Sequence, residues 1–217
     1  MGMLSVAAGV IAWLSPGGLG QSGAVTVKDG TSASLYLSLT GPVADAPSWL
    51  GTILEVASEG TLVVLGVLLV WSWWTGLRRR DARATAGAVL IGAGTIAAYA
   101  VSEAVKLVVD EERPCRALRA AADVIAACPE PGDWSFPSNH ATLAAGLAAG
   151  LAILWPRLAA VTLPLAGAAA LLRVLVGVHY PHDVLAGAIL SSTVVAAVLL
   201  VFLPLAQRTV SRMIPAS

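Results

Sequence analysis

Long apolar runs separated by short polar segments dominate this chain. A helix needs about 17 to 25 predominantly apolar residues to cross the hydrocarbon core of a bilayer, which is about 30 Å thick. Four runs with few or no prolines reach this length: 61–77, 84–109, 158–178 and 184–206. A fifth, shorter run fills 140–155, and 2–20 is a weaker sixth. The pattern predicts an all-α, polytopic membrane helix bundle of about six transmembrane helices.

The first sixty residues depart from this simple alternation. Residues 2–20 lack the basic start of a signal peptide, so we interpret them as an uncleaved span. In 21–60, Gly30, Pro42 and Pro47 interrupt apolar residues at loosely helical spacing, which predicts an amphipathic segment between spans one and two. No repeat or second soluble domain is apparent in the sequence, so we expect one membrane-embedded domain over 1–217.

Composition agrees with a membrane location. Hydrophobic residues make up 57% of the chain and charged residues 12%, and the mean hydropathy is +0.81, outside the range of ordinary soluble domains. The formal net charge is zero, and the only basic tract is Arg78, Arg79 and Arg80. Binding of nucleic acid is therefore not expected, and the partner that the composition implies is the lipid bilayer.

The basic residues of the short loops predict the orientation. They lie in three places, between spans two and three, between spans four and five, and after the last span: Arg78, Arg79, Arg80, Arg83, Arg157, Arg208 and Arg212. With six spans these places share one side, which the positive-inside rule makes cytoplasmic, as are both termini. The segments 21–60, 110–139 and 179–183 then lie on the outer face. Abundant Ala, and Arg in place of Lys, suggest a G+C-rich bacterial genome and hence the bacterial plasma (inner) membrane.

Both cysteines of the chain, Cys115 and Cys128, lie in the outer segment 110–139. An oxidising outer face allows them to pair as a disulfide. Two free thiols are the equally open alternative.

Polar residues interrupt the apolar runs at three places, although an ionisable group at the centre of a bilayer costs about 2.5 to 3.5 kcal/mol. In "KLVVDEERP", Lys106 and Arg113 are seven residues apart, so a helix continuing through both would place them on one face. Pro114 would end that helix at Arg113. The two cations would then converge at the outer surface. Alternatively, Lys106 pairs with Glu103 or Asp110.

The second place is "PSNH". Pro137 and Ser138 before a long apolar run predict a helix start with Ser138 as N-cap. The free N–H groups and the dipole of such a terminus bind anions. His140 lies in this first turn, unless it is an interfacial histidine without a role.

The third place is "RVLVGVHYPHD". Arg173 lies inside the fifth span, His179 lies at its end, and Asp183 lies four residues further on, in the first turn of the sixth span. A carboxylate held against one imidazole nitrogen fixes the tautomer and leaves the other nitrogen as a nucleophile or base. We interpret His182 as an interfacial or indirectly supporting residue.

These three groups share the outer face and together suit phosphoryl transfer. Cations and N–H donors can neutralise the charge that this reaction spreads over three equatorial oxygens. The sequence shows no Cys, His and carboxylate cluster with the spacing of metal ligands, so we expect neither a metal nor another cofactor.

The motifs Lys-x6-Arg-Pro, Pro-Ser-x-His and Arg-x5-His-x3-Asp resemble those of the type 2 phosphatidic acid phosphatase family of membrane lipid phosphatases, whose site is shared with bacterial acid phosphatases and vanadium haloperoxidases. The resemblance implies three roles. The phosphate is held by Lys106, Arg113, Arg173, Ser138 and the backbone of Asn139. The nucleophile is His179, with Asp183 as its partner. The acid that protonates the leaving alkoxide and later activates water is His140.

Two positions depart from the family pattern. Asn139 stands where the family usually has Gly, and Leu172 stands where it usually has Ser. Neither change touches a charged role. The Asn139 amide adds a donor or narrows the site.

The resemblance thus predicts a metal-independent hydrolase that acts on a lipid phosphate through a phosphohistidine. We expect a polyprenyl phosphate or diphosphate, such as undecaprenyl diphosphate of cell-wall carrier recycling. The alternative substrates are phosphatidic acid and phosphatidylglycerol phosphate. A non-catalytic lipid-phosphate binding or transport protein is less favoured, because transporters place polar groups near the midplane. The spans argue against a soluble haloperoxidase.

Overall fold

The computed structural model describes residues 2–18, 23–44, 46–118 and 125–213, so parts of the predicted outer segments 21–60 and 110–139 lie outside it. Within these ranges the chain is helical and has no strand, apart from one bridge between Val25 and Glu111. The helices, in chain order, are α1 (Gly2–Leu14), α2 (Thr31–Ala44), α3 (Ser48–Arg78), α4 (Ala82–Lys106), α5 (Pro114–Ala117), α6 (Asn139–Leu154), α7 (Ala159–Leu175) and α8 (Pro181–Met213).

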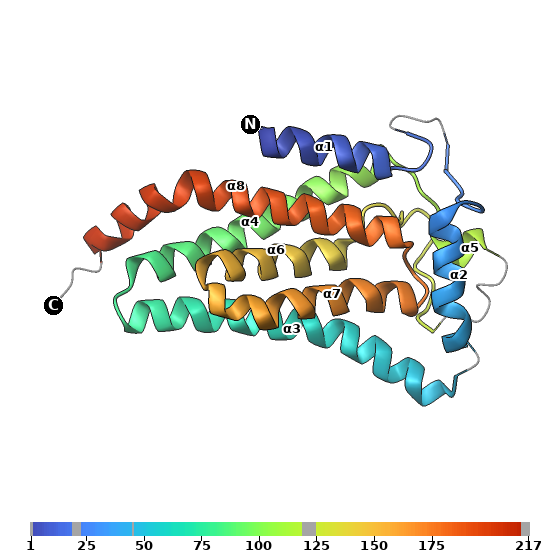
Figure 1. Cartoon of the computed structure of the whole chain (residues 1–217), viewed down its shortest axis with the longest axis horizontal. Coiled ribbons are helices and arrows are strands. Elements are labelled where there is room, and N and C mark those ends of the chain that lie inside the picture. Colours follow the sequence, from blue (N-terminus) through green and yellow to red (C-terminus); the bar gives the residue numbers. More distant parts are fainter. Residues whose placement is uncertain (1, 19–22, 45, 119–124, 214–217) are drawn as a thin grey trace.

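The long helices run side by side around α6, which contacts α3, α4, α7 and α8 (Figure 1). Small residues on α6, such as Ala141, Ala144 and Ala148, are buried. They let neighbouring helices approach closely, as is usual in lipid where the hydrophobic effect does not drive helices together. The turn between α3 and α4 and the C-terminus lie at one end of the bundle, and α2 crosses the opposite end (Figure 1).

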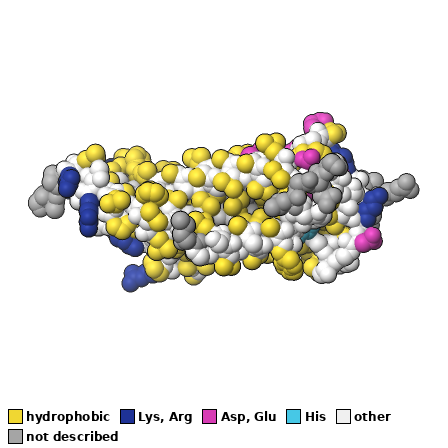
Figure 2. All heavy atoms as spheres, turned by 90° about the horizontal axis from the view of Figure 1, so that it is seen from above, with side chains coloured by type: hydrophobic (Ala, Val, Ile, Leu, Met, Phe, Trp, Pro, Cys, Tyr) yellow, Lys and Arg dark blue, Asp and Glu magenta, His cyan; other side chains and the backbone are white. Residues whose placement is uncertain are grey.

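Four helical segments have the length and composition needed to cross a membrane: Trp49–Arg78, Ala82–Lys106, Pro156–Leu175 and Pro181–Met213. Two further apolar helices, α1 and α6, are shorter. The predicted all-α polytopic membrane bundle is therefore confirmed. However, α1 ends at Leu14, so it is shorter than the predicted span 2–20. Figure 2 shows hydrophobic side chains covering the middle of the bundle and charged ones gathered at its ends.

The predicted amphipathic segment 21–60 consists of two different elements. Helix α2 buries Ala33 and Tyr36 and exposes Leu35 and Leu37. Residues from Ser48 onward instead form the first turns of α3, because after Pro47 nothing interrupts the helix for 31 residues. This longer helix brings Glu59, a residue to which the sequence analysis gave no role, to the end of the bundle where α2 lies.

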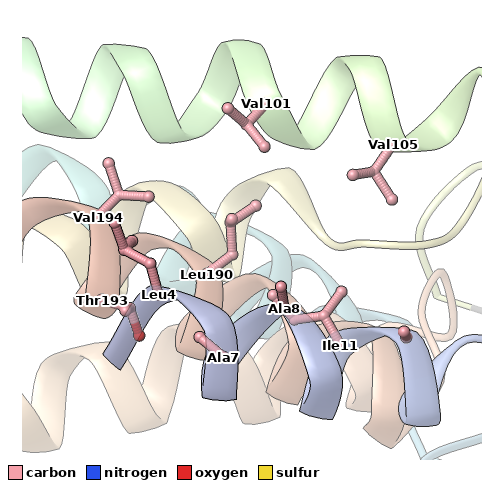
Figure 3. Close-up of a pocket in the computed structure, with 10 residues that line it drawn as sticks. Leu4, Ala7, Ala8, Ile11, Val101, Val105, Leu190, Thr193 and Val194 are labelled. Carbon is pink, nitrogen blue, oxygen red and sulfur yellow. The ribbon is translucent and has the colours of Figure 1, made fainter. Parts of the chain in front are cut away.

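An apolar pocket of about 340 Å³ lies between α1, α4 and α8 (Figure 3). Aliphatic side chains from the three helices form its walls, among them Ile11, Val105 and Leu190, and Thr193 adds a hydroxyl. None of the predicted site residues is among those that line it. The pocket therefore suits hydrocarbon and is separate from the charged site described next.

Candidate active site

The ends of four helices and two loops bring the eight predicted site residues together at one end of the bundle. Lys106 is the last residue of α4, Ser138 immediately precedes α6, and Asn139 and His140 begin it. Arg173 lies in the last turn of α7 and Asp183 in the first turn of α8. The loops that precede α5 and α8 supply Arg113 and His179.

His179 is deeply buried. Its side chain is buried, and burial lowers the pKa of the imidazole to about 3 despite the opposing effect of Asp183. His179 Nδ1 lies 3.4 Å from Asp183 Oδ2, and His179 Nε2 lies 3.2 Å from Arg113 Nη1. The ring is thus neutral near neutral pH, and its Nε2 faces a guanidinium.

Asp183 is held by several donors, one of which the sequence analysis missed. Ser135 Oγ donates to Asp183 Oδ2 at 2.5 Å, and the Tyr180 backbone N–H donates to the same oxygen at 2.8 Å. Ser135 Oγ also lies 3.4 Å from His179 Nδ1. The Asp183 backbone carbonyl accepts from the Ser138 N–H, which ties the starts of α6 and α8 together.

Lys106 and Arg113 meet in a way that differs from the prediction. Helix α4 ends at Lys106, so the two cations do not share a helical face. They meet instead at Asp133, whose Oδ1 lies 3.7 Å from Lys106 Nζ and 2.9 Å from Arg113 Nη2. Lys106 also pairs with Glu103 at 3.2 Å, one of its two alternative partners, whereas Asp133 takes the place expected for Asp110.

The pKa of Asp133 reflects this position. Partial burial raises it, but the hydrogen bond from Arg113 and the charges of Arg113 and Lys106 outweigh burial and hold it below its ordinary value. Asp133 therefore stays ionised and anchors both cations at the site.

Two buried donors at the site have no hydrogen-bond partner. Ser138 is the residue before α6, as predicted, but its hydroxyl makes no cap bond, and both Ser138 Oγ and Arg173 Nε are buried and unsatisfied. Buried polar groups without a partner are rare in folded proteins and need an explanation. Buried donors of this kind suit an anion, which at the start of α6 would also accept from the free N–H groups there.

Glu59 of α3 lies between two of the predicted residues. Its Oε1 is 2.8 Å from His140 Nε2 and 3.8 Å from Arg173 Nη1. The carboxylate oxygen thus holds the position from which an acceptor oxygen of an anion interacts with both groups. No spacing rule links residue 59 to residues 140 and 173, which explains why the sequence analysis missed it.

Asn139, which departs from the family pattern, binds α4. Its Nδ2 donates to Glu103 Oε1 at 2.7 Å, and its Oδ1 accepts from Ser102 Oγ at 2.9 Å. The amide therefore fixes the start of α6 to the end of α4, next to Lys106.

A disulfide joins Cys115 and Cys128, with 5.8 Å between their Cα atoms. Beside it, Arg116 pairs with Glu112 and donates to the carbonyls of Pro129 and Glu130. The segment that follows Arg113 is therefore fastened by a covalent bond and by a guanidinium.

His182 is buried rather than interfacial. Its ring stacks with those of Phe136 and Tyr180, whose centroids are 5.9 and 5.3 Å away. Its Nε2 lies 3.0 Å from Glu111 Oε1 and 3.2 Å from Asp183 Oδ1. Glu111 is a second participant that the sequence analysis missed.

Fold and site together define a helical membrane protein that gathers histidines and cations at one end of its bundle. The chain belongs to the PAP2 superfamily, whose family model matches residues 87–206 and so includes all eight predicted site residues.

Individual relatives extend the comparison. The chain is 38% identical over 113 residues to a decaprenylphosphoryl-5-phosphoribose phosphatase of Mycobacterium tuberculosis, covering 51% of this chain and 58% of that protein. It is 36% identical over 99 residues to the protein of the same description from Mycolicibacterium smegmatis, covering 45% of this chain and 50% of that one. The chain thus spans about half the length of these curated relatives.

A solved structure supports the fold. The crystal structure of a transmembrane PAP2 type phosphatidylglycerolphosphate phosphatase from Bacillus subtilis aligns with a TM-score of 0.52 at 17% identity, over 90% of each chain. At this identity the likeness concerns the fold alone.

Proposed function

We propose that this protein is an integral membrane lipid phosphatase that works through a phosphohistidine without a metal. The observation that carries the proposal is the neutral, buried His179, whose Nε2 lies 3.2 Å from Arg113 beside the unsatisfied donors Ser138 Oγ and Arg173 Nε. These groups combine a nucleophile with donors for the equatorial oxygens of a phosphoryl group.

In the proposed reaction His179 Nε2 attacks phosphorus in line with the bond to the leaving oxygen. The P–N bond forms as the P–O bond breaks, and His140 gives its proton to the leaving oxygen. Water then attacks the phosphohistidine and loses a proton to His140, which releases phosphate and restores His179. In both steps the Asp183 carboxylate holds the His179 ring through Nδ1 of the imidazole.

The proposed substrate class is a polyprenyl-linked phosphate. The description of the mycobacterial relatives names a decaprenyl-linked sugar phosphate, which supports a polyprenyl chain and a phosphomonoester group. Phosphatidic acid and phosphatidylglycerol phosphate are the alternative class. The proposal places the protein in a bacterial plasma membrane, with the site on the outer face and both termini in the cytoplasm.

The test is phosphate release by the purified protein in detergent with EDTA, comparing wild type with His179→Ala. The panel holds decaprenylphosphoryl-5-phosphoribose, undecaprenyl diphosphate, undecaprenyl phosphate, phosphatidic acid and phosphatidylglycerol phosphate. We expect release by wild type only, fastest with a polyprenyl substrate, and inhibition by vanadate, which mimics the pentacoordinate state.

Two results would contradict the proposal. Loss of all activity in EDTA, restored by a divalent cation, would refute the metal-free mechanism. Binding of the panel without release by wild type would favour the lipid-binding or transport alternative.

A further inference from the structure

Behind His179 the structure contains a second, fully enclosed group of ionisable side chains. Glu111 and Asp183 are 0% exposed and His182 is 9% exposed. The side-chain nitrogen and oxygen atoms of these three residues converge within 4.8 Å of one another. The reaction proposed above uses only Asp183 among them, so Glu111 and His182 need an account of their own.

With His179 these three residues form an ordered series of four side chains: Glu111, His182, Asp183 and His179. Glu111 Oε1 lies 3.0 Å from His182 Nε2, and the same nitrogen lies 3.2 Å from Asp183 Oδ1. Asp183 then turns its other oxygen, Oδ2, toward His179. Each carboxyl group in the series touches an imidazole, and Asp183 touches two.

The orientation of His182 is fixed on every side. Ser32 Oγ at the start of α2 lies 2.6 Å from His182 Nδ1, and the rings of Phe136 and Tyr180 stack against the imidazole. The imidazole therefore cannot turn away from the two carboxyl groups without breaking these contacts. The His182 ring, which hydrogen-bonds Glu111 and lies 3.2 Å from Asp183 Oδ1 as an ion-pair partner, restricts how that carboxylate can rotate relative to His179.

The net charge of the buried group depends on the protonation of Glu111 and His182. Two ionised carboxylates around one imidazolium leave a net negative charge in a buried site, which is costly. An added proton on Glu111 removes that charge and leaves His182 paired with ionised Asp183. Burial and the Asp183 carboxylate accordingly raise the pKa of Glu111 to about 8, although His182 opposes the rise.

Glu111 also links this group to the loop before α5 that supplies Arg113. Its backbone carbonyl accepts from the Ser135 N–H at 2.8 Å, and Ser135 in turn holds Asp183. Arg113 follows Glu111 by two residues and contacts His179. Contacts through Glu111 therefore reach both sides of the His179 ring.

We propose that His182 and Glu111 are positioning residues, which hold Asp183 in the orientation that keeps His179 directed at the phosphoryl group. The inference rests on the proposed function, and neither residue touches the substrate. It predicts an effect on the chemical step rather than on substrate binding.

The experiment measures kcat and KM of purified wild type, His182→Asn, Glu111→Gln and Glu111→Leu between pH 6 and 9.5. At pH 6.5 we expect His182→Asn and Glu111→Leu to lower kcat about 10- to 100-fold with little change in KM, as when a functional histidine in a metal site loses its orienting partner. Glu111→Gln keeps the shape and neutrality of protonated Glu111, so it should retain most of the activity at this pH.

The pH profile separates positioning from a purely structural role. Wild-type kcat should decline as Glu111 ionises near its pKa of about 8, because the second carboxylate then competes with Asp183 for the same His182 nitrogen. Glu111→Gln cannot ionise and should lack this decline. Thermal midpoints in detergent, measured for every variant, show whether each protein is folded.

The outcomes are distinct from those of the proposed function. An inactive wild type would remove the proposed function itself. An active wild type with folded variants of unchanged kcat, or a Glu111→Gln profile that declines like that of wild type, would overturn this inference and leave the phosphatase proposal intact.

Discussion

At the scale of single residues, burial decides the protonation of the central imidazole. The pKa of His179 is about 3 in the folded protein and 6.5 ordinarily, so between these values the unfolded chain binds a proton that the folded protein does not. The contribution of His179 to stability is therefore present above 6.5 and is lost as the pH falls toward 3.

This linkage makes a testable prediction. Replacing His179 with Asn removes the titrating group, so the thermal midpoint of His179→Asn in detergent should fall less steeply than that of wild type between pH 7 and 4. Parallel pH dependences for the two proteins would show that His179 is not buried in its neutral form.

Removing the unsatisfied hydroxyl of Ser138 should weaken the binding of a phosphate analogue without lowering the stability of the folded protein. Ser138→Ala should weaken inhibition by vanadate about tenfold, because a hydrogen bond to a charged group contributes about 1.5 kcal/mol or more. It should leave the thermal midpoint unchanged or raise it, since the hydroxyl is buried without a partner.

Ser191→Ala is the matched control for Ser138→Ala. Ser191 Oγ is equally buried and unpartnered but lies on α8, a further two turns beyond Asp183. We expect this control to leave vanadate inhibition unchanged. Equal vanadate inhibition of Ser138→Ala and wild type would argue against a phosphate contact for the hydroxyl.

The residues that the sequence could predict share one property. His140, His179 and Asp183 stand at fixed spacings beside apolar runs, where charge is costly, so each is conspicuous in the sequence. Glu59 and Asp133 are distant in sequence from the residues that they contact, so only the folded chain brings them to the site. No local pattern distinguishes them from ordinary surface acids. Ser135 lies close to the motifs, yet only the fold shows that it binds Asp183.

At the scale of elements, the starts of α6 and α8 meet at Gly187. A Cβ atom at this position would lie 2.5 Å from the Ser138 carbonyl oxygen and 2.7 Å from Thr142 Oγ1. The small residue therefore lets α8 bring Asp183 against the start of α6.

Enlarging this residue should separate the two helix starts. We expect Gly187→Ala to cost about 1 to 3 kcal/mol of stability through overpacking and to lower phosphate release strongly. Gly167→Ala on α7 is the control, because a Cβ there meets nothing within 4 Å. The comparison uses thermal midpoints and phosphate release, and equal values for the two variants would contradict this account of the packing.

Helix boundaries were predictable only where the sequence marks them. Pro181 and the Pro137–Ser138 pair correctly indicated where α8 and α6 begin. The end of α4 at Lys106 carries no such signal, because the apolar residues after it continue the run into a loop that pairs with Val25. The apolar residues after Lys106 indicate burial or contact with lipid, and they do not indicate a helix.

At the scale of the whole molecule, charge is distributed unequally between the two ends. On the face shown in Figure 2, the end that carries the C-terminus displays only Lys and Arg, whereas the opposite end displays acids as well. The orientation, with the site on the outer face, is predicted from this asymmetry and stays a prediction.

Labelling of intact cells tests that orientation. Single cysteines introduced as Lys28→Cys, near α2, and Gln207→Cys, near the end of α8, lie at exposed positions at opposite ends of the bundle. A membrane-impermeant maleimide should label the first variant in intact cells and the second only after lysis. The reverse pattern would place the site in the cytoplasm.

The position of Glu59 has a consequence for turnover. A phosphate that contacts both His140 and Arg173 must displace the Glu59 carboxylate, which returns to the same two groups when the phosphate departs. Glu59 thus competes with a bound phosphate for His140 and Arg173. Under the proposed function this competitor lowers the affinity of the site for the substrate phosphate and the product phosphate alike, so such a site trades affinity for release of its product.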